Sequence, residues 1–280
     1  MLRLRVLTAL ILAPLILWSV LAFSHRALAI ELGLILTVAA WEWARLSGLK
    51  NHIARIVFGC VMFVIMTLLT WLLHGSMVWL SWILYGNLAW WGIALVLVVT
   101  FKKQSDQLPA QFNGIDIVLN LLAGIFIISG AFVALIGLHQ MADYGSLYIL
   151  ILLLLIWIAD IAAYFAGKKF GKHKLAPYVS PGKTWEGVLG AALAVFVAAL
   201  VIGKIRQFQP DNLILFAILV LVTIAFSILG DLTESLFKRR AGVKDSSQLL
   251  PGHGGILDRI DSLMAAAPVF LLGLIQAGIK

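Results

Sequence analysis

Long apolar runs separated by short polar segments cover most of this chain. Windows close to the roughly 20 residues that an α-helix needs to cross a bilayer occur nine times along the sequence. We therefore expect an all-α, polytopic integral membrane protein with transmembrane helices at about 6–23, 27–41, 56–73, 77–100, 117–139, 147–166, 186–203, 213–230 and 263–279. The second window is short and has Glu31 and Glu42 in or beside it, so whether 27–41 spans fully stays open.

Composition agrees with this pattern and excludes an ordinary soluble domain. The mean hydropathy is +1.03 and only 12% of residues are charged, against about a quarter in soluble proteins. The single cysteine, Cys60, lies inside an apolar run. It cannot form an intrachain disulfide, and we interpret it as a packing residue. The segment 102–114 is polar and is expected to form a surface loop.

The first 29 residues allow two interpretations. They combine basic residues, an apolar stretch and a final Ala-x-Ala, as a cleavable signal peptide does. The apolar stretch is long for such a peptide, and further apolar windows follow it. We therefore favour an uncleaved first helix.

The basic residues indicate an orientation. With a cytoplasmic N-terminus and nine spans, 17 of the 21 Lys and Arg residues fall in cytoplasmic segments, and only Arg26, Lys204, Arg206 and Lys280 fall outside. This asymmetry follows the positive-inside rule, and it accounts for much of the net charge of +8. The two large polar segments, 167–185 and 231–262, are then both cytoplasmic, and we expect the chemistry between them.

Four aspartates lie at the ends of predicted spans, at positions 160, 231, 258 and 261. An ionised carboxylate near hydrocarbon is costly unless it meets a cation, a metal ion or water. Asp160 and Lys168 share one helical face, so a simple acid–lysine pair that assists membrane insertion is the alternative to a functional role.

The segment "GDLTESLFKRR" continues the eighth span. Asp231, Ser235 and Lys238 share a helical face, and Glu234 neighbours it. A solvated helix end would look similar, so this segment is informative only together with the run that follows.

That run is "PGHGGILDRID", residues 251–261, which begins with a turn at Pro251 and Gly252. Glycines let backbone amides approach a phosphate closely, which makes Gly254 and Gly255 candidates for phosphate binding. His253 is expected to bind phosphate or to order the loop. The alternative is a glycine hinge before a helix.

Two carboxylates follow the glycines one helical turn apart, Asp258 and Asp261. Mg²⁺ prefers oxygen ligands and commonly takes one or two carboxylates plus substrate phosphates. Arg259 between them offers a bidentate phosphate contact. An acidic first helical turn that complements the helix dipole is the simpler interpretation.

The other polar segment, "GKKFGKHKLAPYVSPGKTWEG", is strongly basic and includes Lys168, Lys172 and Lys183. Its "GKT" is no nucleotide P-loop, because Pro177 stands where that motif needs glycine. Nonspecific attraction of anionic lipid is the alternative to substrate binding. The stretch "SPGKTWEG" predicts a helix start with Glu186 in its first turn.

The run "SLFKRRAGVKDSSQLLPGHGGILDRID", residues 235–261, resembles the signature of the phosphatidate cytidylyltransferases, also called CDP-diacylglycerol synthases. Its fixed positions all agree, and the resemblance extends upstream to about residue 160. The first 140 residues resemble that family only in being hydrophobic. We therefore divide the chain into N-terminal transmembrane helices, 1–140, and a C-terminal catalytic region, 141–280.

The resemblance implies transfer of CMP from CTP to phosphatidate, with Mg²⁺ and K⁺ as a second cation. It leads us to assign as metal ligands Asp160, Asp231, Asp258 and Asp261. We assign as catalytic Asp231, Lys238, Arg239, Asp258, Arg259 and Asp261. The expected substrate-binding residues are Lys168, Lys172, Lys183, Ser235, Lys244, His253, Gly254 and Gly255.

The expected partners are CTP, phosphatidate and membrane lipids, with no nucleic acid; a homodimer is left open. A bacterial inner membrane is the expected location. Two other classes of membrane protein are alternatives. A CDP-alcohol phosphotransferase should contain Asp-x-x-Asp-Gly-x-x-Ala-Arg, which is absent. A transporter would use intramembrane acids as a relay and would not turn over CTP.

Overall fold

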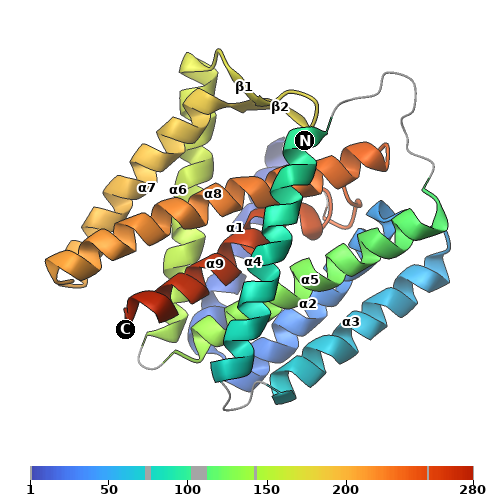
Figure 1. Ribbon diagram of the computed structural model, residues 1–280, viewed down its shortest axis with the longest axis horizontal. Helices are drawn as coiled ribbons and strands as arrows, with labels where there is room; N and C mark the ends of the chain where they lie inside the picture. The colour runs from blue at the N-terminus through green and yellow to red at the C-terminus, as the bar shows by residue number, and fades with distance from the viewer. Residues whose placement is uncertain (1, 73–76, 102–111, 142–143, 251, 280) are drawn as a thin grey trace.

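The computed structural model describes residues 2–72, 77–101, 112–141, 144–250 and 252–279 (Figure 1). Within these ranges lie nine helices and one two-stranded sheet: α1 (Leu2–Ala22), α2 (His25–Leu46), α3 (His52–Leu72), α4 (Met77–Thr100), α5 (Gly114–His139), α6 (Gly145–Phe170), β1 (Lys174–Ala176), β2 (Ser180–Thr184), α7 (Trp185–Ile205), α8 (Pro210–Arg240) and α9 (Leu257–Ala277). Most of the predicted loop 102–114 and the predicted turn residue Pro251 lie outside the described ranges.

The predicted helical membrane architecture is confirmed. Eight helices, α2 to α9, are long and apolar enough to cross a bilayer, and the apolar part of α1 with described side chains is the shorter stretch Leu10–Ala22. The second window, doubtful from sequence, belongs to a 22-residue helix of spanning length. The proposed division near residue 140 stays a prediction, and helices on both sides of it, such as α5 and α9, pack together.

The ends of α2 and α8, the turn of the β1–β2 hairpin and the residue Phe112 before α5 meet at one end of the molecule. They are joined by contacts between residues far apart in sequence, namely Arg45 with Ser246, Arg239 with Val179 and Arg240 with Phe112. At the other end, His25 at the start of α2 lies against His139 at the end of α5. We call the first end the signature end, because it holds the loop 241–256.

α8 and α9 pack closely along each other in the middle of the molecule (Figure 1). Gly230 permits this approach, since a Cβ atom there would lie 2.5 Å from the backbone oxygen of Asp261. Small residues allow helix backbones to approach in this way. The crossing therefore brings Asp231, the next residue on α8, toward Asp261 on α9.

α6 and α7 form a second close pair, with the strands β1 and β2 at its signature end (Figure 1). A Cβ atom on Gly187 would lie 2.9 Å from the Ala163 oxygen, so this contact also requires a small residue. The predicted helix start is confirmed: Thr184 caps α7 by accepting a hydrogen bond from the Gly187 amide at 3.2 Å. The antiparallel hairpin before it was not predicted.

Trp43 fixes α2 in the interior near the signature end. Its indole Nε1 donates to the Asn120 backbone oxygen on α5 at 2.8 Å. Its ring lies 4.6 Å from that of Phe237 on α8, measured between centroids. Both rings are fully buried, so α2 is held against two other helices directly beside Glu42.

Candidate active site

A cavity of about 360 Å³ lies between α6, β2, α7 and α8 near the signature end. Four of the predicted site residues line it: Asp160, Lys168, Lys183 and Asp231. Apolar walls from α6 and α7 adjoin these charges. We call this space the α6–α8 cavity; it joins residues that are up to 72 positions apart in sequence, from Ala159 to Asp231.

Asp231 is the charged centre of this cavity. Its Oδ2 pairs with Lys183 Nζ at 2.6 Å, and its Oδ1 accepts a hydrogen bond from the Ser235 hydroxyl at 3.2 Å. The side chains of Lys183 and Asp231 are 26% and 31% exposed. Because water reaches the pair, an anionic ligand can replace Asp231 as the partner of Lys183 at modest cost.

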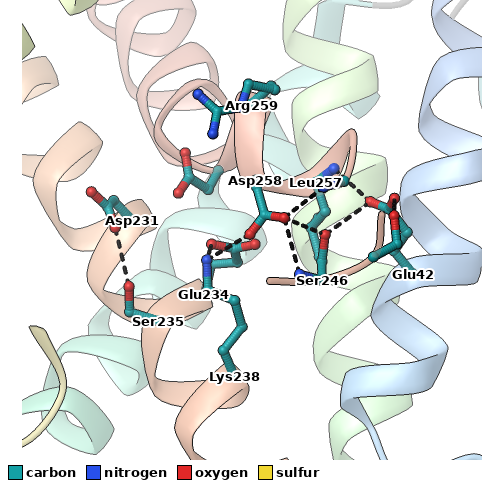
Figure 2. Close-up of polar contacts among 12 residues, drawn as sticks. Glu42, Asp231, Glu234, Ser235, Lys238, Ser246, Leu257, Asp258 and Arg259 are labelled. Carbon is teal, nitrogen blue, oxygen red and sulfur yellow. Dashed lines mark hydrogen bonds and ion pairs between the residues drawn. The ribbon is translucent and has the colours of Figure 1, made fainter. Parts of the chain in front are cut away.

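A second group of charges lies between α8 and α9 and is far more buried (Figure 2). Lys238 Nζ pairs with Glu234 and with Asp258 Oδ1, the latter at 2.7 Å. The side chains of Lys238, Glu234 and Asp258 are 11%, 1% and 6% exposed. One cation thus serves two carboxylates, and the Glu234 Oε1 atom is buried without a hydrogen-bond partner among the described residues.

The other oxygen of Asp258 organises the loop that precedes α9. Asp258 Oδ2 accepts hydrogen bonds from the Gly255 amide at 2.7 Å and from the amide and hydroxyl of Ser246 at 3.0 and 2.8 Å. Figure 2 shows Asp258 between Lys238 on one side and Ser246 on the other. Asp258 therefore links α8, the loop and the first turn of α9. We call Glu42, Glu234, Lys238, Ser246 and Asp258 the buried cluster.

Gly254 and Gly255 of the signature are required by this packing. Gly254 has φ +83°, a left-handed conformation that L side chains adopt reluctantly. A Cβ atom on Gly255 would collide with the Ser246 hydroxyl and with Glu42. Both glycines thus shape the loop, whether or not their amides also approach a phosphate.

The basic residues of the signature differ in their surroundings. Arg259 donates from Nε and Nη2 to the His253 backbone oxygen at 3.1 and 2.9 Å, which braces the loop. Arg239 Nε donates to the Val179 oxygen in the hairpin turn at 3.3 Å. Lys172 and Lys244 are exposed and do not line the α6–α8 cavity.

Glu42 is a member of the buried cluster that sequence reasoning missed. It is fully buried; the Leu257 amide donates to its carboxylate, and the Ser246 hydroxyl lies 3.2 Å from it (Figure 2). In the sequence it only weakened the case for a second span. A carboxylate between two tryptophans in an apolar helix was the available signal, because such an acid needs a partner.

Carboxylate oxygens, the ligand type that Mg²⁺ prefers, are present in this region. Gly230 packs against the backbone of Asp261 where α8 crosses α9, which brings the neighbouring Asp231 toward Asp261, and Glu234 adds a buried oxygen without a described hydrogen-bond partner. No group of three or more His, Cys, Asp or Glu side chains within the described ranges is arranged to hold a metal ion. Mg²⁺ does not need one, because substrate phosphates and water commonly complete its coordination.

Comparisons with known proteins agree with the signature. A model of the cytidylyltransferase family matches residues 3–275. The chain is 41% identical to a phosphatidate cytidylyltransferase of Pseudomonas aeruginosa, over 99% of this chain and 98% of the relative. It is 39% identical to the protein of that name from Haemophilus influenzae, over 96% and 97%. For the Brucella suis protein the identity is 33%, over 99% and 94%.

Proposed function

Because this chain belongs to the cytidylyltransferase family, we propose that it transfers the cytidylyl group of CTP to phosphatidate, forming CDP-diacylglycerol and pyrophosphate. The observation that carries the proposal is the match to a phosphatidate cytidylyltransferase along 99% of the chain. The site is consistent with it, because acidic and basic side chains meet beside an apolar wall that suits a lipid substrate.

The reaction requires little covalent help from the protein. A phosphate oxygen of phosphatidate attacks the α-phosphorus of CTP, and the bond from that phosphorus to the bridging oxygen breaks as pyrophosphate leaves. The nucleophile is already ionised near neutral pH, so no strong base is needed. Charge stabilisation and alignment of two anions supply most of the catalysis in such transfers.

We assign the α6–α8 cavity to a phosphate-bearing part of the substrates. Lys168 and Lys183 line it and supply positive charge. Lys183 is held at 2.6 Å by Asp231, so it is positioned before substrate arrives. When a phosphate enters, Lys183 can donate to it while Asp231 becomes free to act as a ligand.

Mg²⁺ would be held chiefly by Asp231 and Asp261, together with substrate phosphates. Its chemical contribution, when bound, is to offset the repulsion between the two anionic substrates. Asp258 already accepts hydrogen bonds from Lys238, Gly255 and Ser246, so it would act on the site mainly through these neighbours. Direct ligation by Asp258 and Asp160, and a K⁺ ion, stay predictions.

We place the protein in a bacterial inner membrane with the signature end in the cytoplasm, where CTP is found. The bacterial relatives support this location, and the 17 of 21 basic residues expected on the cytoplasmic side support this orientation. A Cys60→Ser chain carrying Lys172→Cys should resist an impermeant thiol reagent in intact cells and react after lysis. The same chain with Gln209→Cys, at the opposite end, should react in intact cells, and the reverse result would refute the orientation.

The activity is tested by incubating the purified full chain with radiolabelled CTP, phosphatidate and Mg²⁺. Label should enter the lipid fraction while pyrophosphate is released in equal amount. A phosphotransferase would instead need CDP-diacylglycerol as a substrate. Ion or lipid flux in vesicles without CTP turnover would show a transporter and overturn the proposal.

A further inference from the structure

Glu42 has no role in the chemistry proposed above, yet its environment is specific. It lies near the signature end of α2, with 0% of its surface exposed. No described lysine or arginine forms an ion pair with it under a 4.0 Å limit. An isolated buried carboxylate is costly unless hydrogen bonds compensate it.

The compensation comes from a segment more than 200 residues away. Glu42 Oε1 accepts hydrogen bonds from the Ser247 hydroxyl and the Ile256 amide, the latter at 3.1 Å. Oε2 accepts from the Leu257 amide at 2.6 Å, and the Ser246 hydroxyl lies 3.2 Å away. Both ends of the loop 246–257 are therefore attached to one carboxylate on α2.

The amide contacts also cap α9. Ile256 is the N-cap residue of α9 and makes no side-chain capping hydrogen bond itself. The first amides of a helix lack partners within the helix, and its N-terminus attracts negative charge. Glu42 satisfies two of these amides from another helix, which fixes where α9 begins.

The contacts continue toward the proposed chemistry through Ser246. Its hydroxyl is within hydrogen-bonding distance of Glu42 Oε2 and of Asp258 Oδ2, at 3.2 and 2.8 Å, and donates to one of them at a time. Asp258 in turn pairs with Lys238 at 2.7 Å. Glu42 is thus linked to the lysine of the signature by three successive contacts, through Ser246 and Asp258 (Figure 2).

We propose that Glu42 is a positioning residue for the cytidylyl transfer: it anchors the loop 246–257 and the first turn of α9, and so sets the placement of Asp258 and Lys238. The inference rests on the proposed function for its kinetic readout. A purely structural Glu42 would change how much protein folds. A positioning Glu42 changes the turnover of the protein that does fold.

The test compares Glu42→Gln, Glu42→Asp and the control Glu31→Gln. Glu31 lies on the same helix, and its carboxylate is not bonded to the loop. Losing hydrogen bonds to an ionised group should lower kcat of Glu42→Gln about tenfold to a hundredfold, with KM for CTP changed less than about threefold. Glu42→Asp keeps the charge and should recover part of kcat, and Glu31→Gln should resemble the wild type.

Hydrogen exchange gives a readout independent of CTP. In Glu42→Gln the amides of Ile256 and Leu257 should exchange at least about tenfold faster than in the wild type, and the amides of α4 should be unchanged. If Glu42→Gln does not fold, Ser247→Ala, which removes one donor to Glu42, should show the same changes more weakly.

The outcomes separate the two proposals. An inactive wild type refutes the function, while the exchange measurement still tests the anchor. An active wild type with Glu42→Gln equal to it in kcat and in exchange overturns the positioning role. A lower yield of folded protein with unchanged kcat overturns it as well.

Discussion

The α6–α8 cavity and the buried cluster contain the same pair of chemical groups in different surroundings. Each centres on a lysine–aspartate ion pair, Lys183 with Asp231 at 2.6 Å and Lys238 with Asp258 at 2.7 Å. The first pair is 26% and 31% exposed, and the second is 11% and 6% exposed. An exposed pair contributes little stability and can exchange partners, whereas removing one member of a buried pair leaves a costly charge. The first pair is suited to binding substrate and the second to holding structure.

Neutralising the carboxylates that we propose as Mg²⁺ ligands should have the largest effect on turnover. Asp231→Asn and Asp261→Asn should each lower kcat by at least about a hundredfold, because each removes charge from the proposed Mg²⁺ site. Thermal unfolding should change little for Asp231→Asn, whose side chain is partly exposed. Steady-state assays at several Mg²⁺ concentrations check this, with Asp211→Asn at the far end of α8 as control. Near-normal activity of either variant at limiting Mg²⁺ would remove that residue from the metal site.

Alanine substitutions of Lys238 and Lys183 should have different effects on protein stability and on substrate binding. Lys238→Ala leaves Glu234 and Asp258 buried without their cation, so unfolding free energy should fall by about 3–5 kcal/mol and kcat about tenfold or more. Lys183→Ala should cost less than about 1 kcal/mol of stability and mainly raise KM. Melting curves in detergent and kinetics on both variants measure the contrast. Equal losses of stability would erase the distinction between the two pairs.

A methyl group added to the signature loop should disturb only the buried cluster. Gly255→Ala places a Cβ atom against Ser246 and Glu42, and such overpacking typically costs about 1–3 kcal/mol. Gly86→Ala on α4, where a Cβ atom meets nothing within 4 Å, serves as the control. The two melting temperatures should therefore differ, with Gly255→Ala the lower. A Gly255→Ala protein as stable as the wild type would show that the loop has room to move.

The smallest effect is expected for lysines at different distances from the cavity. Lys168 lines the α6–α8 cavity, whereas Lys172 is exposed beyond it. Lys168→Ala should raise KM severalfold, and Lys172→Ala should change it less than about twofold, although both remove one positive charge. Titrations of CTP and of phosphatidate distinguish the variants. Equal shifts would mean that these lysines act only through the overall surface charge.

Sequence periodicity predicted the helices and the contacts between residues on neighbouring turns of one helix. The helices were expected from their apolar windows, and the contact between Asp231 and Ser235 follows from i, i+4 spacing. The start of α7 was also expected. These features are local, and local geometry is encoded in residue spacing.

The contacts that sequence reasoning missed join distant segments. Lys183 and Asp231 were both predicted site residues, but nothing in their spacing indicated that their side chains form an ion pair. From the sequence, Glu42 only weakened the prediction that its helix spans the membrane, because its hydrogen-bond partners lie 204 to 215 positions further on. The hairpin β1–β2 is short and contains one proline in its turn, Pro177, and another in β2, Pro181, so its strand pattern was weak. Only the packing of α2 against α9 reveals the buried cluster.

The separation between Glu42 and Leu257 has a consequence for biogenesis. Their hydrogen bond spans 215 residues, and at translation rates of about 5–20 residues per second Glu42 is made roughly 10 to 40 s before Leu257. During that interval the second helix must enter the membrane with an acid that has no permanent partner. We therefore expect α2 to reach its final packing only after α9 has been synthesised, because the hydrogen-bond donors to Glu42 are made last.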